Sequence, residues 1–130
     1  MKWSFSSDTP IYTQLIDQIK ACIVTGEFKP GERLPSVRDL ATEAGVNPNT
    51  MQRALAQLES EGLVFSQRTA GRFVTQENER IDALRRDLAK RHIGVFLSAM
   101  HALAVSQEET LALIEAEFRK ENKVDECPEL

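Results

Sequence analysis

The amino-acid sequence predicts a mainly α-helical fold with a small β-hairpin. Two short, capped helical segments lie on either side of a tight glycine turn, and two β-prone runs follow them. Apolar residues then recur at helical spacing through the rest of the chain. Together these observations predict a winged helix-turn-helix domain over residues 1–76, followed by a C-terminal helical hairpin over residues 77–130.

The first helix is expected to begin at Asp8-Thr9-Pro10, where a side-chain oxygen can cap the free N–H groups and proline suits the first turn. Ile11, Leu15 and Ile19 follow at helical spacing, which predicts one buried face. Gly26 is expected to end this helix.

The next two helices form the helix-turn-helix pair. Ser36 and Asp39 make a capping-box pattern at the start of the first of them. Gly45-Val46 makes a tight turn, and Asn47-Pro48 begins the second helix at once, which Gly62 ends. This short connection through a glycine is typical of a helix-turn-helix.

The remaining elements are a hairpin and two tail helices. The runs 63–65 and 72–75, joined by a loop that contains glycine, predict the hairpin called the wing. From Glu77 an apolar stripe of helical period runs as far as Leu103. A second capping box at Ser106 predicts another helix, and the polar segment from Glu121 to the end is expected to fray.

Composition favours a globular chain. The 130 residues are 28% charged and 42% hydrophobic, which excludes the disordered and collagen-like classes. The longest apolar run, residues 93–105, is too short to cross a bilayer, and the first residues lack a secretory signal pattern. Cys22 and Cys127 have no redox or metal-ligand spacing. We therefore expect a cytoplasmic protein with no membrane partner.

The net charge of −4 is unevenly distributed. Residues 1–76 hold eight Lys/Arg and eight Asp/Glu, whereas residues 77–130 hold eight and twelve. The acidic excess therefore belongs to the tail. Binding of a polyanion then depends on where the basic residues of the first part point.

The second helix of the pair carries the pattern expected of a DNA-reading helix. At 100° per residue, Met51, Leu55 and Leu58 share a buried side. The opposite side carries Asn49, Gln52, Arg53 and Ala56, with Thr50 at its edge. Amides reading adenine and a guanidinium reading guanine match the donor and acceptor code of the major groove. Glu59 and Glu61 would repel phosphates, so base contact is expected to stop near Ala56.

Other candidate contacts to DNA flank this helix. Arg38 projects from the outer face of the preceding helix, and the hydroxyls of Ser36 and Thr50 can donate to phosphate. The wing loop is expected to present two cations, Arg68 and Arg72, and Gly71, which permits close approach of the backbone.

Several stretches resemble the GntR family of bacterial transcription regulators: Pro10-Ile-Tyr-Thr-Gln-Leu, the run from Gly26 to Ala41, the run from Gly45 to Leu55, Leu58-Glu-Ser-Glu-Gly-Leu63 and Gly71-Arg-Phe-Val74. The resemblance covers residues 8–75. It implies a dimeric regulator, usually a repressor, that binds palindromic double-stranded DNA. The family's contacts fall on Arg38, Asn49, Thr50, Gln52, Arg53 and Gly71.

The chain departs from the family's usual wing motif Gly-x-Gly-Thr-Phe. Ala70 replaces the first glycine and Arg72 the threonine. The short tail resembles the YtrA subfamily, in which it serves dimerisation and whose genes often neighbour transporter operons. Two helices cannot bury their own apolar faces, so a homodimer is expected. Its interface is predicted to include Leu84, Leu88, Val95, Phe96, Met100 and Leu103.

Two alternatives stay open. One is a winged-helix protein-interaction module without DNA binding, which the polar outward face and the basic wing disfavour. The other is a regulator gated by a small-molecule effector bound at the tail helices or the domain junction. His92 and His101 lie on opposite sides of one helix, so no metal site is expected. No nucleophile, base and orienting group can be assembled, so we expect neither an enzyme nor a cofactor.

Overall fold

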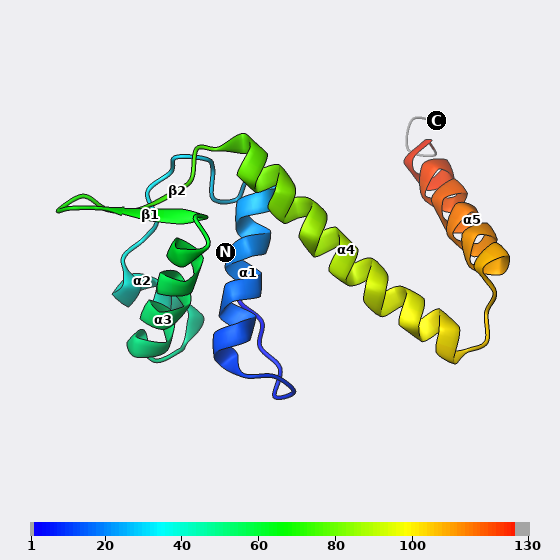
Figure 1. Ribbon diagram of the computed structural model, residues 1–130, viewed down its shortest axis with the longest axis horizontal. Coiled ribbons are helices and arrows are strands. Elements are labelled where there is room, and N and C mark those ends of the chain that lie inside the picture. The colour runs from blue at the N-terminus through cyan, green and yellow to red at the C-terminus, as the bar shows by residue number, and fades with distance from the viewer. Residues whose placement is uncertain (1, 127–130) are drawn as a thin grey trace. The chain divides into compact units, whose positions relative to one another are not determined.

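The computed structural model describes residues 2–126. The elements, shown in Figure 1, are α1 (Ile11–Thr25), α2 (Val37–Ala44), α3 (Pro48–Ser60), β1 (Val64–Gln67), β2 (Gly71–Val74), α4 (Asn78–Ala102) and α5 (Gln107–Glu126). The predicted fold class, mainly helical with one antiparallel hairpin, is confirmed. The chain divides into two compact units, Met1–Asp87 and Leu88–Leu130, with the boundary inside α4.

Side-chain caps start α2 and α3 as expected. Ser36 Oγ accepts a hydrogen bond from the Asp39 N–H at 3.0 Å, and Asn47 Oδ1 accepts from the Asn49 N–H at 2.7 Å. Pro48 occupies the first turn of α3. These caps satisfy N–H groups that have no partner within the helix, and they fix where each helix begins.

The start of α1 differs from the expectation. Its N-cap is Pro10, and no side chain caps its first N–H groups, so the predicted cap from Asp8 or Thr9 is wrong. The reason is that proline itself occupies the cap position and has no side-chain acceptor. Gln14 instead holds the segment before the helix, because its Nε2 donates to the carbonyl oxygens of Ser6 at 2.9 Å and Thr9 at 2.8 Å.

The core of the first unit lies between α1, α2, α3 and the hairpin. Its largest fully buried side chains are Leu15, Ile19, Ile23, Leu40, Met51, Leu55, Leu58, Val64 and Val74. Burying each such side chain stabilises the folded state by about 1.5–3 kcal/mol relative to leaving it in water. The predicted buried faces of α1 and α3 are therefore confirmed, except that Ile11 at the start of α1 is 38% exposed.

The wing is paired on both sides of β2. Antiparallel pairing places Ser66 opposite Arg72 and Phe65 opposite Phe73. On the other side of β2, the N–H of Leu34 donates to the carbonyl oxygen of Arg72 at 2.8 Å, and Arg33 forms a bridge with Phe73. The residues of β2 are therefore held by backbone hydrogen bonds from two neighbours.

The described part of the tail consists of the helices α4 and α5, joined by the short connection 103–106. Ser106 Oγ accepts from the Glu109 N–H at 3.1 Å, which is the cap predicted for α5. The helix continues to Glu126, so the first part of the segment expected to fray from Glu121 is helical in the structure. The rest of that segment, residues 127–130, lies outside the described residues. Among residues 2–126, no helix is both long and apolar enough to span a membrane.

Gly71 offers a test of the wing geometry. Its φ is +105°, and a Cβ added there would lie 3.1 Å from Arg33 Nε. Gly71→Ala should therefore lower the free energy of unfolding by about 1 kcal/mol or more, measured by urea titration. Gly45→Ala is the matched control, since Gly45 also has a positive φ, of +72°, but faces open space. An equal or smaller loss for Gly71→Ala would show that the contact with Arg33 has no cost.

Cys22 offers a test of the first unit's interior. Burial, together with a hydrogen bond to Glu27 Oε2 at 3.3 Å and the charge of Glu27, raises the pKa of this thiol to about 12. In a Cys127→Ala chain, iodoacetamide at pH 8 should alkylate native Cys22 at least about a hundredfold more slowly than in denaturant, since only the thiolate reacts. Adding Glu27→Gln should speed the native reaction. Equal rates in native and unfolded protein would contradict the raised pKa.

Candidate nucleic-acid interface

The polar side of α3 is exposed because the opposite side is fully used in the core. Asn49, Gln52, Arg53 and Ala56 are exposed, and Thr50 is half-buried. The cap at Asn47 begins α3 next to these residues. The candidate base-contacting side chains therefore lie on the first turns of a rigid helix, where recognition helices contact base edges.

Arg53 is held from α1. Its guanidinium carbon lies 4.6 Å from the centre of the Tyr12 ring, a distance that gives a cation–π interaction. The sequence did not indicate Tyr12 as a site residue, although it lies in one of the stretches that resemble the GntR family. The sequence shows only an aromatic residue in the first turn of α1. Its contact with Arg53 could not be predicted, because it depends on how α1 packs on α3.

Arg72 lies in β2, in agreement with the predicted strand run 72–75. The accompanying expectation that Gly71 and Arg72 belong to the wing loop is wrong, because strand pairing begins at Gly71. The Nε of Arg72 lies 3.3 Å from Glu59 Oε1 and its Nη1 lies 3.3 Å from Gln52 Oε1, so it contacts two residues of α3. Ser66 Oγ donates to the same Glu59 oxygen at 2.8 Å. These contacts join the wing to the polar side of α3.

Both carboxylates near the end of α3 have cationic partners. Glu59 pairs with Arg72, and Glu61 Oε1 lies 3.0 Å from the Nζ of Lys20, a buried residue of α1. Each pair offsets one negative charge near the end of α3. The repulsion expected from Glu59 and Glu61 is therefore reduced.

The other candidate contacts lie on neighbouring segments of the same unit. Ser36 and Arg38 are exposed at the start of α2, and Arg68 is exposed in the turn between β1 and β2. Ser36 Oγ accepts from the Asp39 N–H, which leaves its hydroxyl proton available to a phosphate oxygen. Gly71 is exposed at the start of β2.

The residues predicted for a dimer interface fall into two groups. Leu84 is 8% exposed and belongs to the core of the first unit, and Leu88 is half-buried. Val95 and Leu103 are 72% and 69% exposed, and Phe96 is 38% exposed. Met100 is half-buried and lines a hollow of about 490 Å³.

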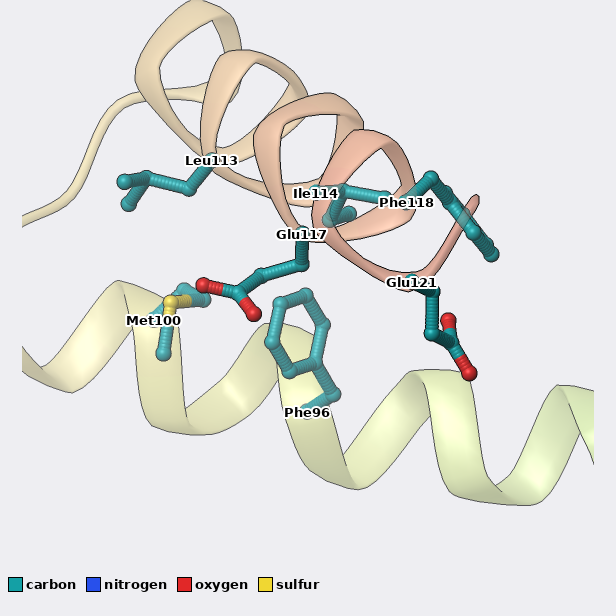
Figure 2. A pocket seen from close by; sticks show the side chains of 7 residues that line it. All are labelled: Phe96, Met100, Leu113, Ile114, Glu117, Phe118 and Glu121. Atoms are coloured by element: carbon teal, nitrogen blue, oxygen red, sulfur yellow. The ribbon is translucent and has the colours of Figure 1, made fainter. Parts of the chain in front are cut away.

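Figure 2 shows this hollow in the tail, with Phe96 and Met100 of α4 pointing toward α5. The side chains from α5 that line it are Leu113, Ile114, Glu117, Phe118 and Glu121. Its lining is apolar apart from the two carboxylates. Within the described residues there is no group of three or more His, Cys, Asp or Glu side chains that could hold a metal ion.

Comparison with known proteins agrees with this geometry. The model of the gntR family of bacterial regulatory proteins matches residues 11–74. YhcF of Bacillus subtilis (strain 168), an uncharacterized HTH-type transcriptional regulator, is 39% identical over 107 residues, which cover 82% of this chain and 88% of YhcF. YtrA of the same strain, an HTH-type transcriptional repressor, is 46% identical over 70 residues, or 54% of each chain.

Two solved structures extend the comparison. A GntR family transcriptional regulator from Listeria monocytogenes superposes with a TM-score of 0.81 at 38% identity, covering 86% of this chain and 98% of that one. AraR(DBD), solved in complex with operator ORX1, gives a TM-score of 0.53 at 28% identity over 58% of this chain and 96% of that one. The chain therefore belongs to the GntR family of bacterial regulatory proteins, and it is a winged helix-turn-helix, DNA-binding transcriptional regulator with similarity to the short, YtrA-like members.

Proposed function

We propose that this protein is a repressor that binds a palindromic operator as a homodimer, with α3 in the major groove. The observation that carries the proposal is the exposed set Asn49, Gln52 and Arg53 on the first turns of a capped helix. The similarity to the repressor YtrA and to the operator-bound AraR(DBD) supports it.

The proposed contacts divide into base-reading and phosphate-binding residues. Arg53 and the amides of Asn49 and Gln52 face outward on α3 and carry the donors and acceptors that base edges require. Exposed cations and hydroxyls on the neighbouring segments would bind phosphate oxygens and fix the register. In this proposal these are Ser36, Arg38 and Arg68, joined by the half-buried Thr50 of α3 itself, with Gly71 allowing the wing backbone to approach.

The exposed apolar surface of the tail supports the homodimer. Ile93, Val95 and Leu97 of α4, and Leu103 directly after it, are between 49% and 72% exposed. On α5, Leu111, Leu113 and Phe118 are between 51% and 60% exposed. Fully burying one large apolar side chain gains about 1.5–3 kcal/mol of free energy, which is lost while the side chain stays in water. A second copy would bury these surfaces and present two α3 helices to the two halves of a palindrome.

A small-molecule effector in the hollow of Figure 2 is the second candidate. It would cover Phe96 and Met100 but would leave Val95, Leu97, Leu103 and Leu111 exposed, because these residues do not line the hollow. A second copy accounts for more of the apolar surface than an effector does. We therefore assign this surface to the dimer.

Base reading can be tested at Arg53. Arg53→Ala should weaken specific binding by about 1–3 kcal/mol and relax the preference at one base pair. Tyr12→Ala should cause a smaller loss, about 0.5–1 kcal/mol, because it removes only the ring that orients the guanidinium. Tyr12→Phe, which keeps the ring, is the control and should behave as wild type. The measurement is competition binding against operator and random duplexes. Equal losses on both would contradict base reading.

The dimer can be tested at Phe96. Phe96→Glu should separate the subunits, because an unpaired carboxylate buried in an apolar interface costs several kcal/mol. Light scattering should then report the monomer mass of 14.6 kDa, and operator binding should weaken by orders of magnitude. Ser98→Glu places the same charge at an exposed position on the other side of α4 and should leave the dimer intact. A wild-type chain that is monomeric yet binds a palindrome tightly would contradict the proposal.

A further inference from the structure

We propose that Arg72 is a positioning residue for base recognition: it orients the Gln52 amide so that Gln52 only donates hydrogen bonds to the DNA and selects guanine over adenine. This inference rests on the proposed function, since it requires Gln52 to face the major groove. The residue that determines specificity would then lie in the wing strand β2 rather than on α3.

The orientation of the amide follows from the chemistry of the pair. Arg72 Nη1 lies 3.3 Å from Gln52 Oε1. A guanidinium has five N–H donors and no acceptor, so the amide oxygen must be the atom that faces it. The contact turns the Gln52 oxygen toward Arg72 and uses one of its two lone pairs. The NH₂ group, with its two donors, is then the part of the amide turned to a ligand.

Arg72 is itself held in place by an ion pair and a backbone hydrogen bond, and Ser66 helps to fix the carboxylate of the ion pair. Its Nε pairs with Glu59 Oε1 at 3.3 Å, and Ser66, its cross-strand partner, donates to that same oxygen at 2.8 Å. Its backbone carbonyl accepts from the Leu34 N–H at 2.8 Å. Gln52 and Glu59 are seven positions apart and therefore lie on one side of α3, two turns from each other. The guanidinium bridges them.

The space beside this bridge can admit a base edge. An open hollow of about 500 Å³ is lined by Gln52, Ala56, Glu59, Ser60, Ser66 and Arg72. Ala56, one turn after Gln52, has only a methyl group. The hollow therefore places the donors of Gln52 next to room for a ligand on the exposed side of the helix.

The remaining donors discriminate between purines. Adenine presents an N7 acceptor and an N6 donor, so its two-bond recognition by an amide uses both the oxygen and the NH₂ group. Guanine presents two acceptors, N7 and O6, which the NH₂ group alone can satisfy. With its oxygen turned toward Arg72 and its NH₂ group toward the base, Gln52 matches guanine and faces the N6 donor of adenine with donors of its own.

The test is selection from randomised palindromic duplexes, followed by competition binding. The loss of preference in Gln52→Ala first identifies the base pair that Gln52 contacts. At that pair the wild type should select G·C, and Arg72→Thr should shift the G·C to A·T affinity ratio toward A·T by about tenfold, because the amide oxygen becomes free. Threonine favours strands, so the variant should keep the wing, and circular dichroism checks this.

Two controls separate positioning from other roles. Arg68→Thr removes a wing cation without touching Gln52; it should weaken binding to all sequences and leave the ratio unchanged. In a Gln52→Ala background, Arg72→Thr should have no further effect on the ratio, because its action passes through the amide. An equal effect in both backgrounds would overturn the inference.

The outcomes also separate this inference from the proposed function. If the wild type selects a defined palindrome but prefers A·T at the Gln52 pair, or if Arg72→Thr leaves the ratio unchanged, the inference fails and the proposed function stands. If the wild type selects no sequence at all, the proposed function fails, and the inference fails with it.

Discussion

The fixed orientation of α3 is the constraint on which the rest of the DNA-binding unit depends. Met51, Leu55 and Leu58 are almost completely buried, so one side of the helix is committed to the core. Rotating α3 to hide its polar side would expose these three residues, at about 1.5–3 kcal/mol each. Hydrophobic packing therefore decides which side chains can meet a base edge, before any polar contact forms.

Polar contacts then restrict the positions of the long side chains on the exposed side of α3. Tyr12 of α1 stacks on Arg53, Lys20 of α1 pairs with Glu61, and Arg72 of β2 bridges Glu59 and Gln52. Each contact limits the freedom of a long side chain before DNA arrives, so less conformational entropy is lost on binding. Within the described residues, α1 and β2 therefore both hold polar side chains of α3 in place.

The tail differs from the first unit in how it buries its apolar side chains. The first unit encloses its own apolar residues, whereas α4 and α5 leave Val95, Leu103, Leu111 and Phe118 largely exposed. Large apolar side chains exposed in such number are uncommon on a protein that does not associate. The first unit thus has a self-contained core, and the second carries the apolar surface that the proposed homodimer would bury.

The sequence by itself determined the elements and the outward face of α3. Caps at Ser36 and Asn47 and the apolar spacing of Met51, Leu55 and Leu58 act over a few residues, so a pattern of one helical turn is enough to predict them. The partners of the site residues were decided only by the tertiary structure. Arg53 meets Tyr12 and Gln52 meets Arg72 because α1 and β2 pack beside α3, and no local pattern records which distant side chains that packing brings together.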